Sequence, residues 1–297
     1  MLSLTPIPPF DFHHAVTGHG WYQLAPYNYD EAAHTLIWPQ RLPDGGIVRV
    51  RLSGSTADEP APWLRAEIDA ASPLTDSDRR FLAQTIGWVI NAERDLRPFY
   101  GHAARVPGYE KAIAQAQGRF LRSSSLFEDF VKVICTTNTT WGQTKGMVRA
   151  LIAGWGEATP WEEAGRCFPT PAALAQVTEP ELRTAGRLGY RAPYVLELAQ
   201  RVVSGDLDLS TFCQPDLPTP DLRKGLLRVK GIGPYAAATL LTLLGHFDHL
   251  AVDSWTRKLV IPRYFPDRAD VTDAEIIAVY ADWHPYQQLA YWFYDWE

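Results

Sequence analysis

The sequence predicts an α+β protein, with a small antiparallel β-sheet domain at the N-terminus followed by a mostly α-helical region. Two observations support this fold class. Short β-branched or alternating runs separated by turn residues occur in the first seventy residues, and from Thr75 onward apolar residues recur at helical spacing instead. We therefore expect a β domain over residues 1–72 and a helical domain over residues 73–297.

The β-sheet is predicted from a hairpin pattern. Residues 34–38 and 47–52 are β-branched or alternating runs, and Asp44-Gly45-Gly46 between them is typical of a turn. A third short apolar run follows the Pro60-Ala-Pro62 segment. Together these runs favour a small antiparallel sheet.

The helical region begins with a capping pattern, because Thr75 and Asp78 have the spacing of a capping box. Further helices are expected over residues 125–134, from Pro171, from Glu181 to Gly189 and over 195–203, with Gly205 ending the last of these. The apolar residues that give the first helix its period are Phe81, Leu82, Ile86, Val89 and Ile90.

Composition sets limits on the kind of protein this is. With 297 residues, 46% of them hydrophobic and 21% charged, the chain has ordinary globular composition, which argues against long disorder. Its cysteines, Cys135, Cys167 and Cys213, lie far apart, which argues against a dense disulfide framework or an all-cysteine cluster, and a reducing cytoplasm fits best. The sequence has no signal-peptide pattern, and no apolar run approaches the length of ~18 residues that a membrane helix needs. We therefore expect no membrane partner.

The most informative segment is a predicted helix-hairpin-helix motif at residues 220–244. Gly231-Ile232-Gly233 is too tight for anything but a turn, and Pro234 is suited to start a second helix that continues through Leu244. The first helix, which begins at Pro220 with Thr219 as its N-cap, is expected to bury Leu222, Leu226, Leu227 and Val229.

Charge around this motif differs from that of the whole chain. The formal net charge is −6, yet residues 221–263 hold seven basic and three acidic side chains. A glycine turn that leads into a helix directs unpaired backbone N–H groups outward, where an anion such as a nucleic-acid phosphate can bind. The alternative is an ordinary helical corner whose glycines only permit close packing.

Asp253 follows Gly233 by twenty residues and opens a new helical pattern. The hairpin VKGIGPYAAA at residues 229–238, this spacing and Val252-Asp253 together resemble the HhH-GPD (helix-hairpin-helix) superfamily of DNA glycosylases. The segments that resemble its 8-oxoguanine and 3-methyladenine branches, within a similarity that runs from Gly118 to the C-terminus, are residues 127–138, 168–174, 188–195 and 284–290.

The resemblance implies a catalytic role for Asp253. Cleavage of the bond between a base and deoxyribose builds positive charge on the sugar, which a nearby carboxylate stabilises while it orients or deprotonates a water. The alternative is that Asp253 is only a helix cap. Family members that also nick the strand have a lysine where this chain has Tyr235, so we expect no lyase activity. The resemblance implies no iron–sulfur cluster, no metal and no other cofactor.

The resemblance also implies contacts to DNA and to the extruded base. In the 8-oxoguanine branch a glutamine of the last helix reads the base, and the matching residue here is Tyr291. For Asn138, which would enter the gap left by the base, a local capping role is the alternative. The expected DNA-binding residues are Gly231, Gly233, Tyr235, Ala236, Lys230, Arg257, Lys258 and Asn138, and the expected base-pocket residues are Trp255, Tyr291, Trp292 and Trp141.

The hypothesis is therefore a monofunctional DNA glycosylase that removes damaged, above all alkylated, purines from double-stranded DNA. We expect it to act as a monomer in a bacterial-type cytoplasm, associated with the nucleoid. Two alternatives stay open at this point. One is an 8-oxoguanine-type glycosylase, and the other is a helix-hairpin-helix protein that binds DNA without catalysis.

Overall fold

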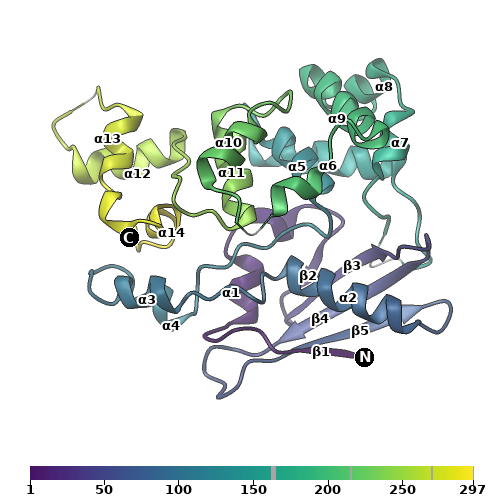
Figure 1. Ribbon diagram of the computed structural model, residues 1–297, viewed down its shortest axis with the longest axis horizontal. Helices are drawn as coiled ribbons and strands as arrows, with labels where there is room; N and C mark the ends of the chain where they lie inside the picture. The colour runs from purple at the N-terminus through teal and green to yellow at the C-terminus, as the bar shows by residue number, and fades with distance from the viewer. Residues whose placement is uncertain (162–164, 215, 269, 297) are drawn as a thin grey trace.

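The computed structural model describes residues 1–161, 165–214, 216–268 and 270–296. Its N-terminal part contains a five-stranded antiparallel sheet in the order β1-β5-β4-β3-β2 (Figure 1). The strands are β1 (Leu2–Leu4), β2 (Asn28–Asp30), β3 (Thr35–Arg41), β4 (Ile47–Gly54) and β5 (Leu64–Ala70). The predicted hairpin is confirmed as β3 and β4, in which Trp38 lies opposite Val50.

The N-terminal part also contains helical structure that the sequence pattern did not predict. Helix α1 (Phe12–Thr17) is capped by Asp11, whose carboxylate accepts a hydrogen bond from the backbone N–H of His14 at 2.8 Å. A 3-10 turn, η1 (Gly20–Gln23), follows it. Both elements are too short to show a helical period, so the segment resembled the turns around it.

Helix α2 (Asp76–Val89) starts with the expected capping box of Thr75 and Asp78 and lies against the sheet (Figure 1). The rest of the described chain is mostly helical, as predicted. The remaining helices are α3 (Arg97–Ala103), α4 (Glu110–Ala114), α5 (Leu126–Thr136), α6 (Trp141–Trp155), α7 (Pro171–Ala175), α8 (Glu179–Thr184), α9 (Ala192–Ser204), α10 (Thr219–Leu226), α11 (Pro234–Leu244), α12 (Ser254–Tyr264), α13 (Asp273–Ala278) and α14 (Gln287–Trp292), with 3-10 turns η2 (Gly189–Arg191), η3 (Leu209–Cys213) and η4 (Ala281–Trp283).

The helix-hairpin-helix motif is formed by α10 and α11, with two differences from expectation. Helix α10 starts at Thr219 and has Pro218 as its N-cap, because the Thr219 hydroxyl bonds His246 and Asp248 instead of the helix end. Leu227 is 37% exposed and is therefore not part of the buried face. The other three predicted core residues of this helix are buried.

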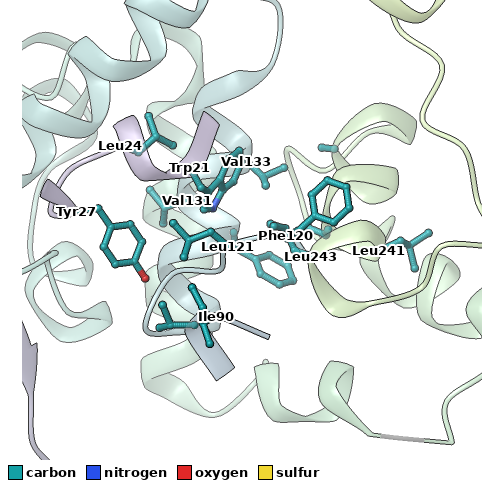
Figure 2. Packing of buried hydrophobic residues seen from close by; sticks show 14 of the residues in the cluster. Trp21, Leu24, Tyr27, Ile90, Phe120, Leu121, Val131, Val133, Leu241 and Leu243 are labelled. Atoms are coloured by element: carbon teal, nitrogen blue, oxygen red, sulfur yellow. The ribbon is translucent and has the colours of Figure 1, made fainter. Parts of the chain in front are cut away.

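One hydrophobic core joins the sheet to the helices. Figure 2 shows Trp21 beside Val131 and Val133 of α5, with Phe120 between this group and Leu243 of α11. The N-terminal segment and α11 therefore pack around the same central helix. The division into domains at residue 72 stays a prediction.

Candidate active site

The turn between α10 and α11 requires glycine at Gly231 for two reasons. Its φ is +87°, which favours glycine, and a Cβ there would lie 2.8 Å from the side chain of Tyr194. Ile232 is buried, and its backbone N–H donates to Val229 O at 3.0 Å. The buried Ile232 and its hydrogen bond thus fix the conformation of the turn.

Four amides of the turn and the first turn of α11 are free. Within the part of the chain that the structure describes, the N–H groups of Gly231, Gly233, Tyr235 and Ala236 donate to no acceptor, and Pro234 has none. Free amides at a helix N-terminus combine hydrogen-bond donors with the positive end of the helix dipole. This arrangement can bind an anion.

Asp253 is the N-cap of α12. Its Oδ1 accepts hydrogen bonds from the backbone N–H of Thr256 at 2.7 Å and from the Thr256 hydroxyl at 2.9 Å. Among the described residues, Oδ2 has no hydrogen-bond partner. One oxygen therefore caps the helix, while the other is available to a ligand.

The carboxylate lies where two hollows meet. A groove of about 930 Å³ runs along the glycine turn, and a cavity of about 470 Å³, here called the aromatic cavity, lies next to it. Asp253 and Tyr235 line both, together with Thr136 and Thr139. The residues with free amides therefore line the groove, and Asp253 lines both the groove and the cavity next to it.

Seven aromatic residues are among those that line this cavity. Trp255 is 55% exposed and Trp292 is 41% exposed, whereas Tyr291 is buried. Burial raises the pKa of Tyr291 to about 12, and the nearby Asp253 carboxylate adds to the shift. The aromatic lining residues are Trp21, Phe120, Trp141, Tyr235, Trp255, Tyr291 and Trp292, so the four predicted base-pocket residues do lie together.

Among the residues of the cavity that were not predicted, three bear on its chemistry. Trp21 lies between His19, whose ring is 5.0 Å away and nearly parallel, and Trp141 at 6.3 Å. Both ring nitrogens of His19 are buried without a partner among the described residues, and burial lowers the His19 pKa to about 3. Gln288 of α14 is buried, and its Oε1 accepts from the backbone N–H of Ala251 at 3.0 Å.

The basic side chains predicted to contact DNA are placed differently from one another. Lys230 lines the groove and forms an ion pair with Glu197 (Nζ to Oε2, 2.7 Å). Arg257 lines neither hollow, because its guanidinium binds Val271 O at 2.7 Å and the Asp273 carboxylate. Lys258 Nζ lies 4.8 Å from the centre of a Trp255 ring.

Asn138 lies in the groove, after the end of α5. Its φ is +45°, and its Nδ2 donates to the hydroxyl of Tyr190 at 3.4 Å. The cap of α6 is Thr140, so the local capping alternative for Asn138 is not what the structure shows.

The described residues contain neither a cluster of potential metal ligands nor a helix that could cross a membrane. No group of three or more His, Cys, Asp or Glu side chains among them could hold a metal ion. In the same residues, no helix has both the length and the apolar character needed to cross a membrane.

Comparison with known proteins gives a consistent result. The family description "HhH-GPD superfamily base excision DNA repair protein" matches residues 131–288. The chain is 25% identical over 287 residues to Bacillus subtilis YfjP, described provisionally as a DNA-3-methyladenine glycosylase, and covers 94% of it. It is 28% identical over 153 residues to an N-glycosylase/DNA lyase of Saccharomyces cerevisiae, of which it spans 40%.

Solved structures share the fold. A 3-methyladenine DNA glycosylase of Archaeoglobus fulgidus matches with a TM-score of 0.77 at 16% identity, over 99% of this chain and 97% of that one. An 8-oxoguanine glycosylase/lyase of Clostridium acetobutylicum matches with a TM-score of 0.66 at 16% identity, over 94% and 93% of the two chains.

Proposed function

Because the chain belongs to the HhH-GPD superfamily of base excision DNA repair proteins, we propose that it is a monofunctional DNA glycosylase that hydrolyses the N-glycosidic bond of alkylated purines in duplex DNA. The observation that carries the proposal is the position of Asp253, which lines both the groove at the glycine turn and the aromatic cavity. A nucleotide extruded from DNA held at the turn would have its sugar near this carboxylate.

Asp253 has the properties that the reaction needs. The carboxylate stabilises positive charge that develops on the deoxyribose, and its unpartnered Oδ2 can accept a proton from an attacking water. Thr256 holds Oδ1 through two hydrogen bonds, which fixes the orientation of the group before substrate binds. The cap and the catalytic group are thus one side chain.

The free amides of Gly231, Gly233, Tyr235 and Ala236 provide the phosphate contact in this proposal. Lys230 lines the same groove and adds positive charge there, part of which is offset by its ion pair with Glu197. We assign no phosphate contact to Arg257, because its guanidinium binds Val271 O and the Asp273 carboxylate.

Hydrolysis without strand cleavage is supported by the side chains around Asp253. A lyase needs an amine that can attack the sugar and form a Schiff base. Tyr235 lies beside Asp253 instead, and in the described part of the chain no lysine lines the aromatic cavity. The phenol of Tyr235 cannot form an imine.

Alkylated purines are supported by the charge of the aromatic cavity. Asp253 is the only formally charged side chain among its described lining residues, since the low pKa of His19 leaves that ring neutral near pH 7. A purine alkylated on a ring nitrogen is cationic, and an aromatic face stabilises such a ring by ~0.5 to 2 kcal/mol. A negative, aromatic cavity without a cation suits that ligand.

Gln288 favours the second candidate, an 8-oxoguanine-type glycosylase. It lies on the last helix, lines the aromatic cavity, and keeps Nε2 free among the described residues while Oε1 is occupied. An amide in that position can form hydrogen bonds with the edge of a neutral base.

The test is incubation with duplexes that each contain one lesion, followed by hot alkali to reveal abasic sites. The substrates are 3-methyladenine, 7-methylguanine, ethenoadenine and 8-oxoguanine. We expect excision of the methylated purines and no adduct trapped by borohydride. Excision of 8-oxoguanine alone would favour the second candidate, and absence of excision from every duplex would contradict a catalytic function.

A further inference from the structure

A separate cavity of about 850 Å³ lies at the other end of α11 from the glycine turn. It is formed where Leu244, Gly245 and His246 at the end of α11 meet the end of α2 and the chain that follows it. It shares no lining residue with the groove or the aromatic cavity. We call it the Arg94 cavity.

The guanidinium of Arg94 has no polar partner in the part of the chain that the structure describes. It lies 5.3 Å from the centre of the Phe247 ring, and no hydrogen bond or ion pair engages it. A Cβ on Gly245 would lie 1.8 Å from Arg94 Nη2, so the guanidinium is packed directly against the end of α11. Arg94 is half-buried and lines the cavity.

Two more arginines lie close to Arg94 and increase the positive charge. Arg119 and Arg122 are buried, and burial lowers the pKa of each to about 10, with repulsion from Arg94 contributing to both shifts. Neither forms an ion pair within the described residues. Arg119 donates to backbone carbonyls, whereas Arg122 donates to Leu243 O and stacks 4.1 Å from a Trp88 ring.

Glu93 also lines the cavity, is exposed and forms no ion pair among the described residues, so it offsets part of this positive charge. The other negative groups nearby are engaged elsewhere. The C-terminus of α11 supplies a partial charge of about −0.5, and Arg122 already bonds a carbonyl there. Asp129 attracts Arg122 but is fully buried and bonds Trp21 and Ser123. Asp95 lines the cavity but forms an ion pair with Arg97 at 2.7 Å.

The cavity also contains an unused neutral donor. Asn91 lines it with 6% of its surface exposed, and its Nδ2 is buried without a partner among the described residues. A buried donor left unpaired costs free energy that a bound acceptor would recover. The guanidinium and the amide thus both lack an acceptor in the same cavity.

We propose that the Arg94 cavity binds a small phosphorylated molecule. A phosphate group has several acceptor oxygens on one centre, so it can accept a forked pair of hydrogen bonds from Arg94 and another from Asn91. Trp88 and Phe212 give the same cavity an apolar wall for the rest of the ligand. The inference does not depend on the glycosylase proposal.

Isothermal titration of the full chain with inorganic phosphate, at ionic strength held constant with sodium chloride, tests this site. We expect saturable binding that weakens by about tenfold or more in Arg94→Gln, because a forked, charge-assisted contact is lost. Arg80→Gln is the matched control, since Arg80 is an exposed arginine of α2 outside the cavity. It should bind phosphate like the wild type.

Two further measurements separate this site from simpler explanations. Arg94→Lys keeps the charge and loses the fork, so its affinity should lie between those of the wild type and Arg94→Gln if both variants unfold like the wild type. Affinity for undamaged duplex DNA should be the same in Arg94→Gln as in the wild type. Absence of saturable phosphate binding, equal binding by Arg94→Gln, or loss of DNA affinity in that variant would overturn the proposal.

Discussion

Asp253 Oδ1 accepts a hydrogen bond from the backbone N–H of Thr256 at 2.7 Å, while the same carboxylate lines the groove and the aromatic cavity. The two interpretations of this aspartate, helix cap and catalytic group, therefore do not exclude each other. Since an asparagine can cap a helix but cannot supply a negative charge, the two roles can be separated by substitution.

Asp253→Asn should leave the fold intact and abolish excision. We expect the free energy of unfolding to change by less than about 1 kcal/mol, because asparagine caps nearly as well as aspartate. The single-turnover excision rate should fall by at least about 100-fold, because the variant lacks the group that stabilises charge in the transition state. Thermal unfolding and a lesion-cleavage assay measure the two effects.

The matched control is Asp208→Asn. Asp208 caps the η3 turn through Ser210 N and is exposed outside both hollows. This substitution should change neither the free energy of unfolding nor the excision rate strongly. If Asp253→Asn keeps the wild-type excision rate, Asp253 is a structural cap and the catalytic assignment is wrong.

The two glycines of the hairpin should behave differently when changed to alanine. Gly231→Ala forces a side chain into positive φ and to within 2.8 Å of Tyr194, so it should destabilise the fold by about 1 to 3 kcal/mol. A Cβ on Gly233, whose φ is −87°, would meet no atom within 4 Å. Gly233→Ala should therefore cost little stability, yet place a methyl group where a phosphate approaches.

Denaturant unfolding and salt-dependent binding to duplex DNA, measured on both variants, check this difference. Gly233→Ala should weaken DNA binding while its unfolding midpoint stays close to that of the wild type. Unchanged DNA affinity in a folded Gly233→Ala protein would mean that the glycine turn serves helix packing alone.

Tyr235 decides whether this site can form a covalent intermediate. Borohydride should trap no adduct between an abasic duplex and the wild type or Tyr235→Phe, because in either protein no lysine among the described residues lines the aromatic cavity. Tyr235→Lys places an amine in the aromatic cavity next to the carboxylate and should yield a trapped adduct. A trapped adduct with the wild-type protein would contradict hydrolysis without strand cleavage.

Local patterns explain why much of the fold and part of the site could be predicted. The β3–β4 hairpin, the Thr75 cap and the α10–α11 turn depend on residues close together in sequence, and each is present. Proximity in sequence also predicts that Arg257 binds DNA, which stays a prediction; its partners in the structure, Val271 and Asp273, come from a later segment and could not be predicted.

The missed part of the site depends on tertiary contacts. Trp21 reaches the aromatic cavity because its Nε1 donates to the buried Asp129 at 2.8 Å, across 108 residues of sequence. His19 is brought in by stacking on Trp21. No periodic pattern in the first twenty residues could indicate either contact. The clusters of aromatic residues near the C-terminus, by contrast, were visible in the sequence itself.

His19 should make the stability of the fold depend on pH in the acidic range. Burial lowers its pKa in the folded state from 6.5 to about 3, with repulsion from Lys132 as a smaller cause. Between these values the unfolded chain binds a proton that the folded chain does not, so this contribution to stability is present above pH 6.5 and is lost as the pH falls.

His19→Phe keeps a ring against Trp21 and removes the titrating group. The free energy of unfolding of this variant, measured by urea titration at pH 7 and pH 5, should fall less on acidification than that of the wild type. An equal fall for His19→Phe and the wild type would mean that His19 takes up its proton in the folded protein, and the aromatic cavity would then contain a cation in acid that disfavours a cationic base.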